Sequence, residues 1–325
     1  MAESVVLGVD AGGSYTRAVC VGLDGRVLGV ARAGGGSPTH NADASEQVQR
    51  AISDALDGSD RRASDVVALA AGLAGFGSER DRRWADSFFD LDGLDCPREI
   101  VNDTVVAHAG AFAGGPGVIV VAGTGSMILA ITESGEVVRN DRYHHYAGGA
   151  RHLSFDAMAR ILMGQRGATD DDFIASVLDY WHAADPDELR QRIRDLETQD
   201  SNDVKRFYGA MAPLVTSAAE QSDMASAACH WLAGVTSVGV RLLGEHFDQT
   251  PVLVARAGAV ATCPAISRPL AAYLEKSDSP RYKLVDARLR PVGGAALLAL
   301  RRAGVDTDEA VVKSIHAGTS QRHTA

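Results

Sequence analysis

Two carboxylates in the first third of the chain occupy positions where phosphate chemistry would need them. Asp10 closes the apolar run 5–9 and is followed by small residues over 11–14. Asp103 follows a shorter apolar run and precedes a helical pattern over 105–112. A carboxylate at the end of a strand can hold a hydrated Mg²⁺ or accept a proton from an attacking hydroxyl. Because backbone N–H groups in a glycine turn can approach phosphate oxygens, the pattern indicates phosphoryl-transfer chemistry.

A second turn of the same kind lies farther along the chain. The apolar run 118–122 leads into Gly-Thr-Gly-Ser at 123–126, and a further apolar run follows. Strand, small-residue turn and strand therefore occur twice, which suggests two related half-domains that face one nucleotide. A third glycine turn, at Gly258 and Ala259, follows the apolar run 252–255 and suits close packing against an adenosine.

Each of these features also has an ordinary interpretation. Short glycine motifs are common in plain β-hairpins, so a single one carries little weight. Asp10 could be a turn-forming residue, and Asp103 could be the N-cap of the helix that follows it. The order and spacing of the turns along one chain favour the phosphate interpretation.

In this order and spacing, the motifs resemble those of a known family. The chain is similar to the N-acetylglucosamine kinase group, which shares a family with the BadF/BadG/BcrA/BcrD-type ATPases of the sugar kinase, Hsp70 and actin superfamily. The residues that carry the resemblance are 10–17, 71–75, 102–103, 123–126, Gly258, Gly293 and Gly294. The resemblance implies an α/β fold with two ribonuclease-H-like (actin-like ATPase) domains around a nucleotide cleft. It also implies ATP and Mg²⁺ as cofactors.

The resemblance further implies roles for individual residues in a kinase that transfers the γ-phosphoryl group of ATP to a sugar hydroxyl. Asp103 would be the general base and Asp10 the Mg²⁺ ligand. The residues expected to contact the nucleotide are Gly12, Gly13, Ser14, Thr16, Arg17, Gly123, Thr124, Gly125, Ser126, Gly258 and Ala259. Those expected to contact the sugar are Thr39, His40, Asn41, Gly75, Asn102, Asp103, Gly149, Arg151 and His152. Arg17 and Arg151 could equally lie on the protein surface.

One motif departs from the family pattern. Where the family usually carries Gly-Asp-Glu-Gly-Ser, residues 149–154 read Gly-Ala-Arg-His-Leu-Ser. Carboxylates accept hydrogen bonds from sugar hydroxyls and Arg cannot, whereas Arg binds a carboxylate or a phosphate bidentately. The resemblance implies an amino sugar such as N-acetylglucosamine or glucosamine as substrate, and the altered motif is the reason to weigh another. An acidic sugar, such as a 2-keto-3-deoxy sugar acid, is the alternative.

Two other classes of function stay open. An ATPase without a sugar substrate, which activates another enzyme through a bridged iron–sulfur cluster, needs closely placed cysteines. The cysteines here, Cys20, Cys96, Cys229 and Cys263, are widely spaced. A sugar-responsive regulator needs an additional DNA-binding domain, and a strand pattern that begins at Val5 leaves no room for one.

The composition limits which partners the protein can bind and in which cellular compartment we expect it. The 325 residues carry a formal charge of −10, which disfavours nucleic acid as a partner. No lysine precedes Lys205, so the first glycine turn lacks a Walker-type lysine. Since no signal peptide is visible and no apolar run approaches the ~20 residues of a membrane span, we expect a cytoplasmic protein with no membrane partner.

The element pattern predicts the domain organisation. We expect an N-terminal actin-like ATPase domain over 1–107, a C-terminal one over 108–316 and a disordered tail over 317–325. Five successive helical patterns over 154–249 are too long for a simple crossover, so they predict a helical insertion in the second domain. We expect this insertion to be a dimerisation surface and the protein to be a homodimer.

Overall fold

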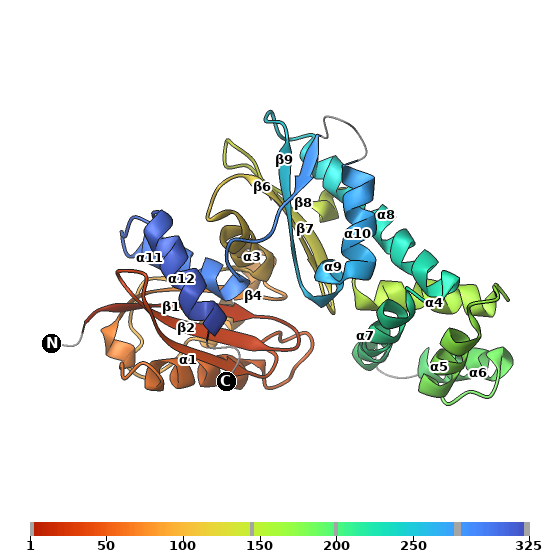
Figure 1. Cartoon of the computed structure of the whole chain (residues 1–325). Coiled ribbons are helices and arrows are strands. Elements are labelled where there is room, and N and C mark those ends of the chain that lie inside the picture. The colour runs from red at the N-terminus through yellow and green to blue at the C-terminus, as the bar shows by residue number, and fades with distance from the viewer. Residues whose placement is uncertain (1–2, 144–145, 198–200, 276–280, 322–325) are drawn as a thin grey trace. The chain divides into compact units, whose positions relative to one another are not determined.

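The computed structural model divides the chain into two compact units. It describes residues 3–143, 146–197, 201–275 and 281–321. The first unit comprises Met1–Ile119 and Asp286–Ala325, and the second comprises Val120–Val285. Within the described residues, each unit combines helices with a five-stranded sheet (Figure 1). The expected α/β class is confirmed.

The first sheet has the strand order β3-β2-β1-β4-β5. Its strands are β1 (Val5–Ala11), β2 (Thr16–Gly22), β3 (Val27–Ala33), β4 (Val66–Leu73) and β5 (Arg98–Asn102). The helices of this unit are α1 (Ala44–Asp57), α2 (Arg82–Ser87), α3 (Asp103–Phe112), α11 (Pro291–Arg302) and α12 (Glu309–Gln321). β1 runs antiparallel to β2 and parallel to β4, which runs parallel to β5. The carboxyl ends of β1, β4 and β5 therefore meet at one edge of the sheet.

Helices cover both faces of this sheet, because its strands are apolar on both sides. Figure 1 shows α1 on one side and α11 with α12 on the other. Leu7, Val9 and Ile52 belong to the core on the α1 side. Val6 and Leu297 belong to the core on the α11 side. The alternation along β1 sends successive side chains into different cores, which explains why the strand is apolar apart from Asp10 near its end.

Glycines let α11 approach its neighbours closely. A Cβ at Gly8 would lie 2.5 Å from the backbone nitrogen of Ala296, so β1 and α11 are in backbone contact there. A Cβ at Gly294 would lie 2.4 Å from the nitrogen of Gly110 on α3. Gly294 thus lets α11 pack closely against α3, the helix that begins at Asp103, whereas Gly293 faces Ile315 and Leu289.

The second sheet has the strand order β10-β9-β6-β7-β8. Its strands are β6 (Gly117–Ala122), β7 (Ser126–Ile131), β8 (Val137–Arg139), β9 (Val252–Ala257) and β10 (Tyr282–Leu284). The helices are α4 (Ala150–Leu162), α5 (Asp171–Tyr180), α6 (Pro186–Glu197), α7 (Ser201–Ala218), α8 (Asp223–Gly244), α9 (Ala259–Thr262) and α10 (Pro264–Leu274). In both sheets, three consecutive strands are followed by two later ones on the side of the first strand. The repeated strand–turn–strand motif therefore marks two sheets of the same order.

The domain limits differ from the sequence-based expectation. The chain leaves the first unit after Ile119 rather than at residue 107, and it returns at Asp286. The return occurs because α11 and α12 bury Val292, Leu300 and Ile315 against the first sheet. The expected disordered tail is helical as far as Gln321, and residues 322–325 lie outside the described part. The helical block begins at Ala150, four residues earlier than expected.

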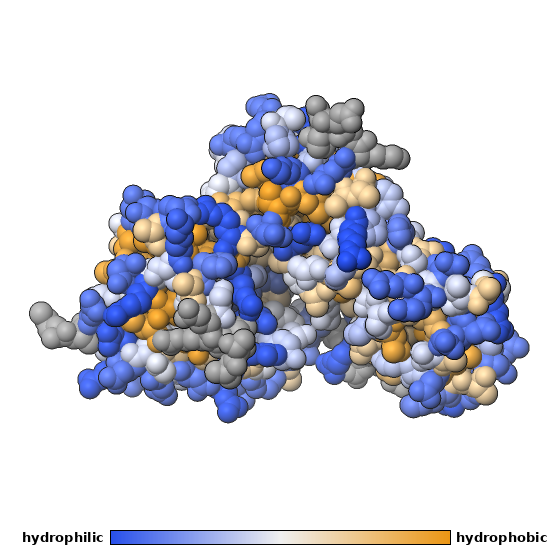
Figure 2. Space-filling view, in the orientation of Figure 1, coloured by the Kyte–Doolittle hydropathy of each residue, from blue (hydrophilic) through white to orange (hydrophobic). Residues whose placement is uncertain are grey.

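The visible surface of each unit is mostly hydrophilic, with smaller hydrophobic areas between the polar side chains (Figure 2). Among the described residues, no helix is long and apolar enough to cross a membrane.

Candidate functional site

Asp10 lies at the carboxyl end of β1 and is 9% exposed. Its backbone pairs with that of Arg17 on β2, and Arg17 Nη1 lies 3.7 Å from Asp10 Oδ2. The cross-strand register thus places a cation beside the buried carboxylate. Arg17 is part of this arrangement, so it does not simply cover the outside of the strand.

Asp103 is the first residue of α3, directly after β5. Gly72 on β4 lets this helix approach, because a Cβ there would lie 3.0 Å from the Cα of Asp103. Gly72 also pairs in register with Asp10 on β1. The two carboxylates predicted from separate strand ends are therefore brought to the same edge of the sheet.

Asn102, not Asp103, caps helix α3. Its Oδ1 accepts a hydrogen bond from the N–H of Thr104 at 3.0 Å, and its Nδ2 donates to the carbonyl of Phe76 at 2.8 Å. The cap that sequence reasoning allowed for Asp103 is thus supplied by the preceding residue. This arrangement leaves the Asp103 carboxylate available for chemistry and gives Asn102 a positioning role.

The electrostatics of the two carboxylates are unusual. Burial raises the pKa of Asp10 from 3.8 to about 7; Arg17 opposes this shift and Asp103 adds to it. Burial also raises the pKa of Asp103 to about 6, against hydrogen bonds from Thr104 and from its own N–H. Without a bound metal ion, the pKa values of both carboxyl groups therefore lie close to neutral pH. A divalent ion beside Asp10 would favour its ionised form.

The turn after Asp10 is held by the glycine-rich loop that follows β3. Gly12 N–H donates to the carbonyl of Tyr15 at 2.9 Å, and Gly36 N–H donates to the carbonyl of Gly12 at 3.0 Å. Asn41 Nδ2 donates to the carbonyl of Gly13 at 2.8 Å. Asn41, predicted to contact the sugar, thus ties the two loops together, and the carbonyls of Gly12 and Gly13 turn toward this loop.

The same loop carries a small hydroxyl–imidazole cluster. Thr39 Oγ1 lies 2.9 Å from His40 Nδ1, and the buried Ser37 Oγ lies 2.9 Å from Thr39 Oγ1 and 3.1 Å from His40 Nδ1. Gly75, with φ +95°, faces this cluster, since a Cβ there would lie 3.8 Å from Thr39 Oγ1. Thr39, His40 and Gly75, which the sequence predicted to contact the sugar, are therefore neighbours.

Ser37 is a member of this cluster that sequence reasoning missed. Its side chain is fully buried, and its carbonyl accepts hydrogen bonds from the N–H groups of His40 and Asn41. The sequence feature that could have indicated this role is the place of Ser37 in a loop beside a proline, where serine side chains often hydrogen-bond to the nearby backbone. We assign Ser37 a positioning role for Thr39 and His40.

Thr16 is buried inside the first unit. Its side chain is fully buried, and its Oγ1 lacks a hydrogen-bond partner in the described structure. A Cβ at Gly36 would lie 2.6 Å from this oxygen, so Thr16 packs beneath the glycine-rich loop. The expected phosphate contact by Thr16 does not fit this position, because alternation along β2 sends its side chain inward.

The second glycine turn lies in the second unit, between β6 and β7. Gly123 N–H donates to the carbonyl of Gly125 at 2.9 Å, and Thr124 at the tip is exposed. A Cβ at Gly123 or Gly125 would meet no described atom within 4 Å, so there is open space around the turn. Ser126 follows as the first residue of β7, and its Oγ is buried without a partner in the described structure.

Helix α4 begins against this turn. A Cβ at Gly149 would lie 2.7 Å from the carbonyl oxygen of Gly125, and Ala150 N–H donates to the carbonyl of Gly123 at 2.9 Å. The positive end of the helix dipole therefore lies beside the turn, which favours an anion there. Glycine at 149 is required by the close approach.

Arg151 and His152 occupy the first turn of α4. His152 Nδ1 accepts a hydrogen bond from the N–H of Gly149 at 3.2 Å, the role that a glutamate plays in a capping box. Arg151 is half-buried and forms no hydrogen bond or ion pair with the residues that the structure describes. Arg151 thus belongs to the first turn of the helix that begins against the Gly123 turn, and the His152 side chain has a structural role.

The third glycine turn packs on the end of β6. Gly258 has φ +88°, and a Cβ there would lie 2.4 Å from the carbonyl oxygen of Ala122. The turn at Gly258 and Ala259 is therefore in contact with the residue that precedes Gly123. The second unit thus gathers Gly123–Ser126, Gly149 and Gly258 in one place.

Solved structures with the same fold include two whose names identify them as sugar kinases. A proposed N-acetylglucosamine kinase from Chromobacterium violaceum matches with a TM-score of 0.69 at 23% identity, covering 92% of this chain and 99% of that one. A ROK family glucokinase from Streptomyces griseus, in complex with glucose and AMPPNP, matches with a TM-score of 0.61 at 18% identity, covering 91% and 98%. At these identities the likeness establishes the fold: two α/β halves of the actin-like ATPase and sugar kinase type.

The sequence comparison identifies the family. A model of the BadF/BadG/BcrA/BcrD ATPase family matches residues 7–299, so the chain belongs to that family. An N-acetylmuramic acid/N-acetylglucosamine kinase of Clostridium acetobutylicum is 28% identical over 147 residues, which are 44% of this chain. The chain matches about half the length of that relative, 47%.

Proposed function

We propose that this protein is an ATP-dependent sugar kinase, which transfers the γ-phosphoryl group of ATP to a sugar hydroxyl. The observation that carries the proposal is the pair of carboxylates, Asp10 and Asp103, at one sheet edge beside a glycine turn. Carboxylates with a purely structural role are usually exposed to solvent or fully paired, whereas Asp10 is buried, Asp103 nearby is half-buried, and the pKa values of both are raised. Such perturbed groups are typical of functional sites.

Asp103 is proposed as the general base. The carboxylate accepts the proton of the acceptor hydroxyl as that oxygen attacks the γ-phosphorus, and the bond to the β-phosphate oxygen breaks. Its place at the first turn of α3 favours the ionised form through the helix dipole. Asn102 fixes this helix end through Thr104 and Phe76.

Asp10 is proposed as the Mg²⁺ ligand. Among the described residues, no group of three or more His, Cys, Asp or Glu side chains gathers as a metal site. A site with a single protein carboxylate suits Mg²⁺, which usually takes one or two carboxylates and completes its shell with phosphate oxygens and water. When bound, the ion neutralises phosphate charge. Arg17, Gly13 and Ser14 in the first unit, and Gly123–Ser126 with Gly258 in the second, are proposed to bind the nucleotide.

The raised pKa of Asp103 predicts a pH dependence. A base works only when ionised, and this carboxylate takes up a proton as pH falls through about 6. We therefore expect kcat/KM to be constant above about pH 7 and to fall roughly tenfold per pH unit well below 6. Initial rates at sugar and Mg-ATP concentrations well below KM, measured from about pH 5 to 8, check this. A rate that stays constant across that range would contradict the role of Asp103.

The proposed substrate is an amino sugar, such as N-acetylglucosamine or glucosamine. Support comes from the Clostridium relative, whose name includes N-acetylglucosamine, and from the polar cluster of Thr39, His40 and Asn41. A hydroxyl, an imidazole and an amide suit a neutral ring with hydroxyl and amide groups. The half-buried Arg151 favours the alternative, an acidic sugar, because a guanidinium without an ion pair is suited to a carboxylate.

Replacement of Arg151 distinguishes these two substrates. If Arg151 binds a substrate carboxylate, Arg151→Ala should raise KM for an acidic sugar about 10–100-fold, since a charged hydrogen bond is lost. KM for a neutral sugar should be unchanged. Arg151→Lys is the matched control, because it keeps the charge and loses the bidentate geometry. Equal changes with acidic and neutral sugars would contradict the specificity role.

ADP release from Mg-ATP with a panel of sugars tests the proposed function itself. The panel contains glucosamine, N-acetylglucosamine, N-acetylmuramic acid, glucose and a keto-deoxy sugar acid. Turnover of any of them supports the kinase, and the preferred sugar identifies the substrate class. ATP hydrolysis that no sugar stimulates would favour an ATPase without a sugar substrate, and absence of ATP binding would favour a regulator. A homodimer in the cytoplasm stays a prediction.

A further inference from the structure

Tyr15 is a large aromatic residue in the first glycine turn, residues 12–15, and it is 46% exposed. Its neighbours in this turn, Gly13 and Ser14, are small. The carbonyl of Tyr15 accepts the hydrogen bond from Gly12 N–H that closes the turn, at 2.9 Å. The position of Tyr15 therefore affects the shape of the turn that is proposed to bind the nucleotide.

The strand register places two arginines beside this turn. Asp10 on β1 pairs with Arg17 on β2, and Arg17 pairs with Arg32 on β3. Side chains that lie directly opposite on neighbouring strands share one face of the sheet, about 5 Å apart, and like charges in such positions repel each other. Asp10 compensates the charge of Arg17 at 3.7 Å, whereas Arg32 forms no ion pair with the residues that the structure describes. Arg32 therefore keeps an uncompensated positive charge at this edge of the sheet.

The Tyr15 ring lies against both guanidinium groups. Arg32 Cζ is 3.6 Å from the ring centroid, the distance of a stacked cation–π contact, and Arg17 Cζ is 5.9 Å from the same centroid. The negative face of the ring offsets part of the repulsion between the two cations. Because Arg32 belongs to a strand of the sheet, the stack also fixes the tip of the turn to a rigid element.

From this arrangement, we propose that Tyr15 and Arg32 are positioning residues for the polyphosphate of the nucleotide, an inference that rests on the proposed function. The stack orders the first glycine turn before the nucleotide arrives, so binding does not have to supply the cost of ordering it. It also keeps Arg32 beside Arg17, where a second positive charge attracts the polyphosphate.

Binding of Mg-AMPPNP, a nucleotide that is not hydrolysed, tests this role by titration calorimetry. Tyr15→Ala and Arg32→Ala should each raise the Kd about tenfold, since each removes the stack. Tyr15→Phe keeps the ring and should bind within about twofold of the wild type. Because both side chains act through one stack, the double alanine variant should be little weaker than the weaker single variant. Two independent contributions would instead multiply to about 100-fold.

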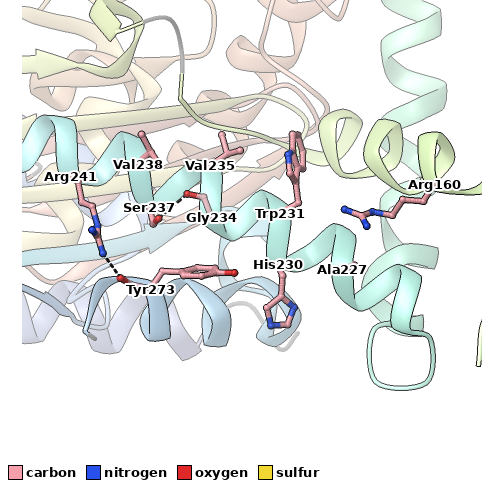
Figure 3. Close-up of a pocket in the computed structure, with 10 residues that line it drawn as sticks. All are labelled: Arg160, Ala227, His230, Trp231, Gly234, Val235, Ser237, Val238, Arg241 and Tyr273. Atoms are coloured by element: carbon pink, nitrogen blue, oxygen red, sulfur yellow. Dashed lines mark hydrogen bonds between the residues drawn. The ribbon is translucent and has the colours of Figure 1, made fainter. Parts of the chain in front are cut away.

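Two exposed residues of the same types supply matched controls. Arg26→Ala removes an exposed arginine just before β3. Tyr273→Ala removes a tyrosine of the second unit that is 36% exposed and borders the groove beside α8. Figure 3 shows the Tyr273 ring extending away from the guanidinium group of Arg241, which donates to the Tyr273 carbonyl at 2.6 Å. This tyrosine thus has an arginine neighbour without a stack, and both controls should bind Mg-AMPPNP as the wild type does.

The outcomes separate this inference from the proposed function. A wild type without affinity for Mg-AMPPNP would overturn the proposed function and this inference with it. If the wild type binds, three results would overturn the inference alone: alanine variants with wild-type affinity, a Tyr15→Phe variant as weak as Tyr15→Ala, or a double variant about 100-fold weaker than the wild type. Unfolding temperatures of all variants, measured alongside, should equal that of the wild type within a few degrees, because both side chains are exposed.

Discussion

Replacing Asp103 with Asn is expected to lower kcat by about 10²–10⁴-fold while leaving the affinity for Mg-ATP largely unchanged. The amide has nearly the same shape as the carboxylate but cannot accept the proton of the acceptor hydroxyl. The nucleotide is proposed to bind through the glycine turns, which this substitution leaves in place. Quenched-flow or steady-state rates, together with nucleotide titration by calorimetry, would separate the two effects.

The control for this variant is Asp92→Asn, an exposed carboxylate to amide change in the same unit. It should leave both kcat and nucleotide affinity at the wild-type level. A loss of only a few-fold in Asp103→Asn would remove Asp103 as the general base. A comparable loss of Mg-ATP affinity would instead indicate a role in nucleotide binding.

Asp10→Asn is expected to separate activity from stability. Without the carboxylate, Mg²⁺ loses its proposed protein ligand, so kcat/KM for Mg-ATP should fall at least about 100-fold. The same change should stabilise the protein in metal-free buffer at alkaline pH. Because the folded pKa of Asp10 is raised to about 7, ionisation in the fold becomes unfavourable as pH rises above the unfolded value of 3.8. The amide carries no such penalty, although it also loses the Arg17 contact.

Thermal unfolding at two pH values checks this second prediction. The difference in unfolding temperature between Asp10→Asn and wild type should be larger near pH 8 than near pH 4.5, where the wild-type carboxyl is protonated in the fold. Asp57→Asn, an exposed change on α1, should change neither kcat/KM for Mg-ATP nor the unfolding temperature. Retained Mg-dependent turnover in Asp10→Asn would exclude Asp10 as the metal ligand.

Much of the fold follows from local sequence patterns. The strands and helices around Asp10, Asp103 and Gly123 were predictable because apolar runs, glycine turns and helical spacing are features of neighbouring residues. The resemblance to a family then assigned the glycine turns to nucleotide and sugar contacts, which stay predictions. The structure brings Gly149 and Gly258 to the Gly123 turn through backbone contacts that only glycine permits.

Other features depend on contacts between distant residues, and the sequence alone did not predict them. The return of α11 to the first sheet depends on the close backbone contact between Gly8 and Ala296, which lie far apart in the chain. Thr16 was expected at a phosphate, but the exact alternation of β2 against the loop at Gly36 buries it. Asn102 was expected to contact the sugar, but its two hydrogen bonds make it the N-cap of α3. The sequence did not predict this role because it depends on the residue at which α3 begins.

The interrupted course of the chain has a consequence for protein synthesis. A ribosome completes the second unit, Val120–Val285, before it adds the last helices of the first. Until then, one face of the first sheet, including Val6 and Val19, lacks the cover of α11. The unit that is begun first is thus finished last. Chaperones that bind exposed apolar strands would meet this nascent chain at the sheet of its N-terminal half, even after its middle has folded.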